Sequence, residues 1–348
     1  MDENKISNLS QLGEFGLISR VTESVDKSNG DLLKGVGDDA AVIKCGNGVQ
    51  LVSSDLFLEG IHFDLTYFPL KHVGYKCVVA TIADIYAMNG TPVYITISLG
   101  LSSKMKLELI DELYDGFKLA CSEYNITIIG GDTTTALTGL TIGITAVGSA
   151  KEEEVIYRNG AKADNLICIT GDLGGAYMGL QLLEREKHVF EATKVSTPDF
   201  SGREYLLERQ LKPSLPTGLF GYLKELEVKP TSLIDVSDGV ASDIRQICLA
   251  SGVGCKIYED KLPIDHTTSL TAEEMGINPT VAALNGGDDY EFMFTIPASD
   301  FEKFSKQTDI PIYIIGHTTS QPDEFLLVTA SGQEVELKAQ GWGDLNAQ

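Results

Sequence analysis

Aspartates at the ends of apolar runs are the feature that most constrains how this chain folds. They recur in GVGDDAAVI (35–43), the SSD ending at Asp55, the GGD ending at Asp132, DVSDG (235–239) and GGDDYE (286–291). Each occurrence alone is typical of a turn or a helix cap, because Asp hydrogen-bonds nearby backbone, and Ser237 or Asp238 is an ordinary N-cap residue. The recurrence favours a fold in which several strand ends carry carboxylates to one cleft.

Asp84 is the most informative single residue because it lies inside an apolar helical pattern, VVATIADIYAM (78–88). An unpaired carboxylate is strongly penalised in such surroundings, so it must be paired, hydrogen-bonded or bound to a metal. A salt bridge to a distant Lys or Arg and a metal site both remain open at this stage.

Clustered carboxylates suit hard cations, and Mg²⁺ binds through a few carboxylates together with water and substrate phosphates. No His/Cys pair has the spacing of zinc ligands. Glycines beside the acids would let backbone amides approach phosphate oxygens. The chain has no G-x-x-x-x-G-K-[ST] loop, no G-x-G-x-x-G after the first strand and no protein-kinase motif set. A nucleotide site would therefore be of another type.

Composition narrows the class of protein. At 348 residues and 43% hydrophobic residues, the chain is expected to form two domains, 1–150 and 151–348, that meet at a polar stretch near 150–165. The 27 basic and 50 acidic residues give a net charge of -23, which argues against a nucleic acid or an anionic membrane as partner. Dispersed cysteines, a polar N-terminus and the lack of a membrane-length apolar run predict a cytoplasmic protein with buried thiols.

Strand-like and helical patterns alternate in both halves, which predicts an α/β protein. The expected strands cover 40–45, 49–55, 93–101, 126–132, 140–148, 166–170, 232–237, 254–260 and 290–296. Helices are expected over 71–90, 105–124, 177–187 and from Val240 to Cys248. The pattern over 188–215 is too weak to place an element.

The motifs, taken in order, resemble the thiamine-monophosphate kinase family, part of the superfamily that includes aminoimidazole ribonucleotide synthetase. They are GEFGLI (13–18), GVGDDAAVI, VSSDLFLEGIHF (52–63), VVATIADIYAMNGTP (78–92), IIGGDTT (128–134), YRNGAKADN (157–165), DVSDGVASD (235–243) and NGGDDYEF (285–292). The resemblance implies a two-domain α/β (α+β) fold of the synthetase type. Its N-terminal domain would contribute sheet to a dimer barrel, and its C-terminal α/β domain would complete the substrate site.

The same resemblance implies ATP-dependent phosphorylation of thiamine monophosphate to thiamine diphosphate, with several Mg²⁺ ions and a homodimer. The implied metal-site residues are Asp39, Ser54, Asp55, Asp84, Asp132, Asp235 and Asp238. The implied nucleotide contacts are Tyr114, Gly131, Asp132, Arg158 and Ser237, and the implied substrate contacts are His62, Asp288 and Trp342. The chain departs from the family pattern with IAD (82–84) in place of LSD and GGDD in place of GGED.

Simpler readings compete with these roles: Arg158 as an exposed turn residue, His62 as a surface histidine and Trp342 as a cap on the core. Two other functions also stay open, namely another ATP-using enzyme of the superfamily that activates an amide oxygen, and a non-catalytic Mg-nucleotide binding dimer. No Ser-His-Asp or Cys-His arrangement is apparent, and a phosphate monoester with a second pKa of about 6 is already largely ionised at pH 7. We therefore expect direct in-line transfer without a general base.

Overall fold

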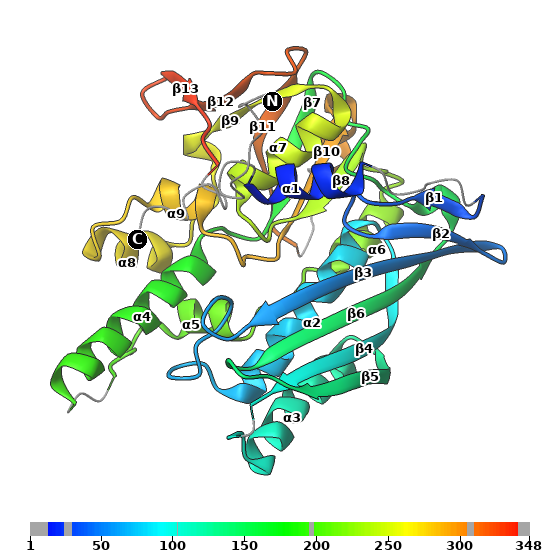
Figure 1. Cartoon of the computed structure of the whole chain (residues 1–348). Helices are drawn as coiled ribbons and strands as arrows, with labels where there is room; N and C mark the ends of the chain where they lie inside the picture. Colours follow the sequence, from blue (N-terminus) through cyan, green and yellow to red (C-terminus); the bar gives the residue numbers. More distant parts are fainter. Residues whose placement is uncertain (1–12, 24–29, 103, 195–197, 305–309, 340–348) are drawn as a thin grey trace, which may run out of the picture.

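The computed structural model describes residues 13–23, 30–102, 104–194, 198–304 and 310–339. The described residues form two β-sheets and the helices that pack on them (Figure 1). The first sheet is built from residues 32–150 and the second from residues 165–336. The expected division into domains 1–150 and 151–348 remains a prediction.

The first sheet has six strands in the order β1-β2-β3-β6-β4-β5. They are β1 (Leu32–Lys34), β2 (Ala41–Cys45), β3 (Gly48–Leu58), β4 (Thr91–Leu101), β5 (Thr127–Thr135) and β6 (Thr141–Ala150). All neighbouring strands are antiparallel except β4 and β5, which are parallel. Buried and partly exposed residues alternate along β6, as expected for a strand with one face on the core. β5 lies at the sheet edge (Figure 1).

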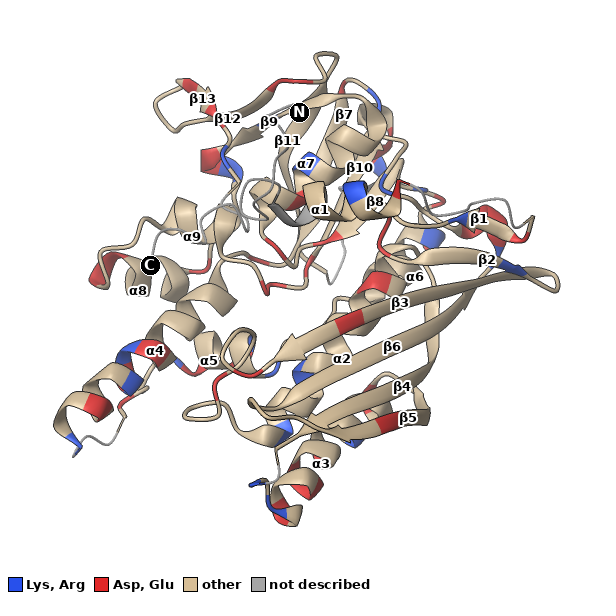
Figure 2. Ribbon diagram, in the orientation of Figure 1, with Lys and Arg blue, Asp and Glu red and all other residues tan. Residues whose placement is uncertain are grey.

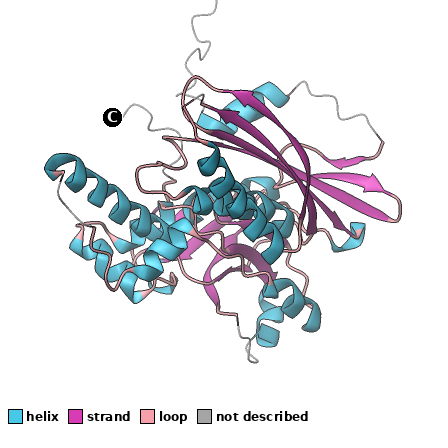
Figure 3. Ribbon diagram, turned by 90° about the horizontal axis from the view of Figure 1, so that it is seen from below, coloured by secondary structure: helices cyan, strands magenta, loops and turns pink. Residues whose placement is uncertain are grey.

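Helix α2 (Leu70–Ala87) is the packing centre of the first half. It is buried on nearly every face because it packs on β3, β4 and β6 and also contacts β8 of the second sheet. Figure 3 shows helices packed against one face of the first sheet. Helix α3 (Leu107–Glu123) lies against α2, and the two backbones approach at Gly74 and Gly116. A Cβ atom at Gly116 would overlap the carbonyl oxygen of Lys71, so only glycine permits this crossing.

The second sheet has seven strands in the order β13-β12-β9-β11-β7-β10-β8. They are β7 (Asn165–Thr170), β8 (Ser232–Asp235), β9 (Gly254–Tyr258), β10 (Phe292–Pro297), β11 (Ile312–Thr319), β12 (Phe325–Val328) and β13 (Glu334–Glu336). Neighbours are antiparallel except β9 and β12. β8 and β10 are buried along almost their whole length, and their buried residues include the polar Ser232, Asp235 and Thr295.

Helices surround this second sheet. They are α4 (Gly175–Thr193), α5 (Glu204–Leu211), α6 (Gly218–Glu225), α7 (Val240–Ser251), α8 (His266–Glu274), α9 (Pro279–Asn285) and α10 (Phe301–Phe304), and α1 (Gly13–Thr22) precedes the first sheet. Side-chain caps start α8 and α9, where Asp265 and Asn278 accept the amide protons of Thr267 and Thr280. α7 ends at Gly252 in the left-handed conformation.

The structure confirms the mixed α/β class and every expected strand and helix, most of them to within about three residues; α4 runs on to Thr193, beyond its expected end at 187. Residues 188–215, whose sequence pattern was too weak to predict an element, contain the end of α4 and all of α5. Strands β1, β11, β12 and β13 were missed because they are short or lack a clear alternation. Within the described ranges, no helix combines the length and apolarity needed to span a bilayer. Five of the six cysteines are buried, whereas Cys45 is exposed.

The crossing of α2 and α3 gives a stability test. Gly116→Ala should lower the free energy of unfolding by about 1–3 kcal/mol, because the added methyl group must push the two helices apart. Gly221→Ala in α6 is the matched control, since a Cβ atom there meets open space and alanine favours helix. Thermal unfolding of both variants measures the difference, and equal melting temperatures would contradict the close approach.

Candidate active site

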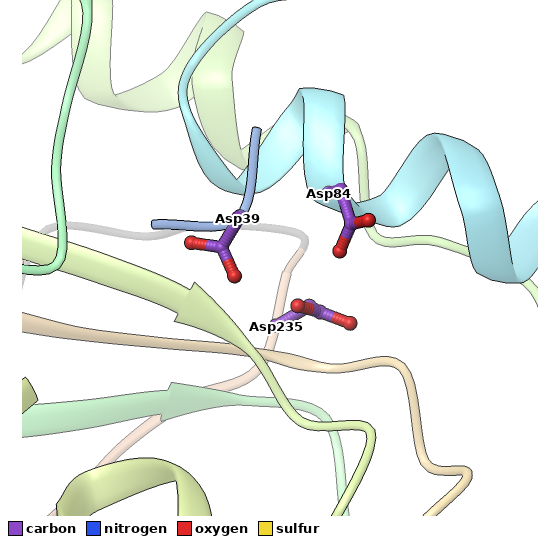
Figure 4. A group of neighbouring side chains, drawn as sticks. All are labelled: Asp39, Asp84 and Asp235. Atoms are coloured by element: carbon purple, nitrogen blue, oxygen red, sulfur yellow. The ribbon is translucent and has the colours of Figure 1, made fainter. Parts of the chain in front are cut away.

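Three carboxylates from distant parts of the chain meet between the two sheets. Asp39 precedes β2, Asp84 lies on α2 and Asp235 ends β8. Each offers an oxygen atom, and these three atoms lie within 4.8 Å of one another (Figure 4). Figure 2 shows acidic positions both along β3 and along the loops at the facing end of the second sheet. Two of the acids at strand ends, Asp39 and Asp235, therefore converge as predicted, and they meet Asp84 of helix α2.

Burial makes this cluster electrostatically costly. Burial raises the pKa of Asp84 well above its ordinary value, and the neighbouring carboxylates of Asp55, Asp235 and Asp39 raise it further. The pKa of Asp235 is raised in the same way, by burial and then by Asp39. Among the described residues, no Lys or Arg forms an ion pair with Asp84 or Asp235. The salt-bridge explanation for Asp84 therefore has no support in the described part of the chain.

The donor set fits Mg²⁺. Arg158 binds only one oxygen of Asp39, with Nη2 at 2.6 Å from Oδ1, while the buried Oδ2 has no hydrogen-bond partner. An unpartnered buried carboxylate oxygen is costly unless something else binds it. The cluster supplies oxygen donors alone, which is the preference of hard divalent cations.

The two adjacent acids of GVGDD face different partners. Asp38 forms an ion pair with Lys34 at 3.1 Å, and its Oδ1 accepts the backbone amide proton of Arg158 at 3.0 Å. Asp39 binds the Arg158 side chain and joins the carboxylate cluster. Asp38 thus anchors the loop, a role that the sequence left open, and Asp39 faces the site. Arg158 is largely buried, which replaces the reading of an exposed turn residue.

Strand β3 contributes to the site through alternate residues. The hydroxyl of Ser53 donates to Asp84, and the neighbouring Asp55 carboxylate helps to raise the pKa of Asp84. Ser54, the serine that the family pattern favours, is exposed, and its Oγ lies 3.0 Å from Oγ1 of Thr145 on β6. Successive strand residues face opposite sides of a sheet. Ser53 lies two residues before Asp55, and this spacing could have predicted that both side chains face the site.

The loop after β8 carries Ser237 and Asp238, which are exposed and line the same cavity as the cluster. Asp243 was not assigned a role from the sequence, and in the structure its side chain binds backbone amides at the N-terminus of α7. Its Oδ2 accepts the amide protons of Gly239 at 3.1 Å and Asp238 at 3.3 Å. A carboxylate in the first turn also favours a helix N-terminus electrostatically. Asp243 therefore fixes the loop that follows Asp235 and carries Asp238.

Two cavities adjoin at this place. The first, of about 810 Å³, is lined by most of the predicted site residues: Asp39, Ser54, Asp55, His62, Asp84, Arg158, Asp235, Ser237, Asp238 and Asp288. The second, of about 290 Å³, is lined by aromatic rings of Phe57, Phe63, Tyr67 and Phe68. The two share Phe57, His62, Asp288 and Tyr290. An acidic cavity thus opens beside a ring-lined one, and the predicted substrate residues His62 and Asp288 lie at their junction.

Both junction residues are held in place. Nζ of Lys76 lies 2.9 Å from Oδ2 of Asp288, and although burial works in the other direction, the Lys76 ammonium lowers the pKa of Asp288. His62 is exposed, as a surface histidine would be, and its Nδ1 accepts the backbone amide proton of Leu58 at 3.0 Å. Partial burial lowers the pKa of the ring. A neutral His62 therefore carries its proton on Nε2 and acts as a donor there.

Tyr114, Gly131 and Asp132 are not brought to either cavity within one chain. Asp132 is exposed on the edge strand β5, which is separated from β3 by β6 and β4. Gly131 has a structural role as well, because a Cβ atom there would overlap the carbonyl of Ile97 on β4. Trp342 lies outside the described residues. The nucleotide and substrate roles of these four residues remain predictions.

The carboxylate cluster predicts that removal of one buried charge stabilises the metal-free protein, whereas most substitutions destabilise a protein. With a chelator present at pH 7.5, Asp84→Asn should melt at a higher temperature than the wild type, because it removes one of several facing charges while keeping an acceptor for Ser53. A raised folded pKa means that wild-type stability falls as pH rises above the unfolded value of about 3.9, so the advantage should vanish on acidification below it.

Asp111→Asn, the same change at an exposed position of α3, should leave the melting temperature unchanged. Adding Mg²⁺ should stabilise the wild type more than Asp84→Asn, because a ligand of the folded state raises its stability. A less stable Asp84→Asn without metal, together with no Mg²⁺-dependent shift, would show that the protein itself satisfies Asp84.

Comparison with known proteins agrees with this geometry. Residues 37–150 match the family AIR synthase related protein, N-terminal domain. The chain is 30% identical to the thiamine-monophosphate kinase of Aquifex aeolicus over 334 residues, which cover 96% of this chain and 98% of that protein. It is 32% identical to the thiamine-monophosphate kinase of Escherichia coli K12 over 340 residues, which cover 95% and 97%.

Solved structures share the fold over nearly the whole chain. The structure of AaThiL complexed with AMPPCP and TMP superposes with a TM-score of 0.79 at 28% identity, and covers 96% of this chain and 98% of that one. Hydrogenase maturation protein HypE in complex with ATP superposes with a TM-score of 0.67 at 19% identity, a likeness of fold alone. On the extent and identity of these matches, the chain belongs to the thiamine-monophosphate kinase family.

Proposed function

We propose that this protein transfers the γ-phosphoryl group of ATP to thiamine monophosphate and forms thiamine diphosphate. The observation that carries the proposal is the acidic cavity that opens beside a ring-lined cavity, with His62 and Asp288 at their junction. The family relatives carry the name of this activity, and AaThiL was solved with AMPPCP, an ATP analogue, and TMP. The acidic cavity would take the phosphates, and the ring-lined cavity would take the heterocyclic part of the acceptor.

Asp39, Asp84 and Asp235 would hold Mg²⁺, together with Asp55 and Asp238 from the same cavity. Bound Mg²⁺ would neutralise phosphate charge, so that one anion can approach another. Arg158 braces Asp39 from the opposite side and keeps its second oxygen directed away from the guanidinium. The side chains that bear the charge are thus oriented before the phosphates arrive, which lowers the cost of reorganisation during transfer.

The ring-lined cavity suits a cationic heterocycle. Phe57, Tyr67 and Phe68 offer ring faces or edges. The wall also carries three carboxylates and the two ammonium groups of Lys76 and Lys187 that pair with them, which leaves the carboxylates in excess: Asp64, Glu184 and Asp288. Aromatic faces and carboxylates both attract a positively charged ring such as the thiazolium of thiamine. Trp342 is proposed to add a further ring on the substrate side, as the family pattern implies.

The chain supplies no general base in this proposal. The acceptor is a phosphate monoester whose second pKa is about 6, so its attacking oxygen is already largely ionised at pH 7. His62 already accepts a backbone proton at Nδ1, so its remaining nitrogen donates in the neutral ring. His62 would therefore orient the acceptor through a hydrogen bond, and transfer would be direct and in line.

A homodimer is part of the proposal, and it rests on the edge strand β5. Its nine residues are almost all exposed, and no strand of the described residues pairs with its outer edge. Ile129 is 56% exposed on this strand and Tyr94 is 44% exposed on β4 beside it, which is unusual for an isolated sheet edge. Pairing through this edge would cover both residues, and it would place Gly131 and Asp132 next to the second copy.

The direct test is incubation of the purified protein with ATP, Mg²⁺ and thiamine monophosphate, with thiamine diphosphate measured by chromatography. We expect Mg²⁺-dependent product, and a loss of about 10²-fold or more in kcat for Asp55→Asn, because phosphoryl transfer depends on charge stabilisation. Asp111→Asn, at an exposed position outside both cavities, is the matched control. Full turnover in excess chelator would contradict the metal-assisted mechanism.

The same assay separates the two other functions. If ATP with Mg²⁺ raises the melting temperature of the protein but no thiamine diphosphate forms, the protein is a nucleotide-binding dimer. Release of ADP only with an amide-containing acceptor would indicate the synthetase type of reaction.

The proposed role of His62 has its own test. His62→Asn should raise KM for thiamine monophosphate and largely keep kcat, since it removes a hydrogen-bond donor without removing a base. His188→Asn, an exposed histidine on α4, serves as the control. A loss of about 10²-fold or more in kcat, as expected when a general base is removed, would overturn this assignment.

A further inference from the structure

A buried arginine lies beneath the loop that carries Asp288. Arg209 extends from α5, and its side chain is 12% exposed. Nη1 donates to Oε1 of Glu291 at 2.9 Å, while Nη2 donates to the carbonyl oxygens of Asp172 at 2.9 Å and Asp289 at 3.2 Å. Arg209 lines neither cavity, so it does not belong to the site described above.

The loop above it, GGDDYE (286–291), has an unusual backbone. Asp288 and Tyr290 adopt left-handed φ values of 59° and 51°, which cost free energy for residues with a side chain. Such conformations persist only where surrounding contacts fix them. Two backbone contacts do so from one side: the amides of Asp288 and Tyr290 donate to the carbonyls of Ser237 at 2.8 Å and Val236 at 2.9 Å.

The left-handed residues send adjacent acids in opposite directions. Asp288 lines the cavities and pairs with Lys76. Asp289 is 1% exposed, and its Oδ2 accepts the amide proton of Gly174 at 2.9 Å at the start of α4. Arg209 is the cation on this inner side, with Nη2 at 3.6 Å from Oδ1 of Asp289. The inner acid is thus fixed by Arg209 and α4, and the outer acid faces the substrate side.

Glu291 is the last member of the hydrogen-bond network around Arg209. Its Oε2 accepts the hydroxyl proton of Thr170 at 2.6 Å, and its carboxylate fills the space where a side chain at Gly171 would lie. Asp289 and Glu291 are both buried, and a buried carboxylate needs a cation and hydrogen bonds to remain charged. The positive charge of Arg209 pairs with both carboxylates, and its guanidinium also donates to the backbone carbonyl of Asp289.

We propose that Arg209 is a positioning residue that fixes the left-handed GGDDYE loop, so that Asp288 meets Lys76 at the junction of the two cavities. The kinetic part of this proposal rests on the proposed kinase function, whereas the structural part does not. A change at Arg209 should therefore act through Asp288, at a distance from the reacting atoms.

The kinetic experiment is a double-mutant cycle on the full chain. Arg209→Gln should raise KM for thiamine monophosphate by about tenfold, a typical coupling between groups in one network, and change KM for ATP less than about twofold. In an Asp288→Ala background the same substitution should add less than about twofold. Arg203→Gln is the control, because Arg203 flanks the same helix and pairs with Glu274 away from the loop. Equal effects with and without Asp288 would overturn the proposal.

Hydrogen exchange gives a readout that needs no activity. Arg209→Gln should speed exchange of the amides of Asp288 and Tyr290 by about tenfold, while Arg203→Gln leaves them unchanged. If the wild type forms no thiamine diphosphate, the proposed function fails, and this measurement still decides the role of Arg209. Unchanged exchange in a folded Arg209 variant would overturn it.

If Arg209→Gln does not fold, the neutral combination Arg209→Met with Asp289→Asn and Glu291→Gln removes the buried charges together. It should fold and show the same fast exchange. Wild-type exchange in this variant would show that the loop holds its backbone without Arg209.

Discussion

The structure depends on carboxylates that are buried next to one another. Asp84 lies on α2, the helix that packs on the first sheet and also touches β8 of the second sheet. Its position brings Asp39 and Asp235 within reach, so the two halves of the chain meet at a point of charge repulsion. A site built in this way is costly without a cation, and this cost is the physical basis of the proposed Mg²⁺ site. We expect these buried like charges to lower folding stability in the absence of a cation.

Two acid pairs in the sequence are divided in the same manner. In GVGDD, Asp38 binds Lys34 and a backbone amide, while Asp39 faces the cluster. In GGDD, Asp289 binds a backbone amide and lies beside Arg209, while Asp288 faces the cavities. One acid of each pair anchors the loop, and the other serves the site. Adjacent carboxylates therefore need not share a ligand, because a tight turn sends their side chains to different partners.

The site also depends on contacts between loops. The GGDDYE loop donates two amides to the loop after β8, so Asp288 is positioned relative to Asp235 and Asp238. Asp243 closes the start of α7 and fixes that second loop. The loop that carries Asp288 and the loop that carries Asp238 thus form one hydrogen-bonded unit. A change in either loop is expected to alter both substrate affinity and the arrangement of the acids.

The sequence by itself determined the α/β class, most strands and the importance of Asp84, since these follow from local periodicity and from the cost of a carboxylate in an apolar helix. Its motif order also indicated the family. Ser53 was within reach of sequence reasoning, because period two places it with Asp55 on one strand face. Only the tertiary structure decided that Arg158 pairs with Asp39 across 119 residues, and that Arg209 reaches Glu291 across 82. It also placed Asp132 on an exposed edge, away from the acids that it resembles in sequence. Local patterns report which face of an element is buried, whereas the pairing of charges depends on how distant elements pack, which a single sequence does not encode at any fixed spacing.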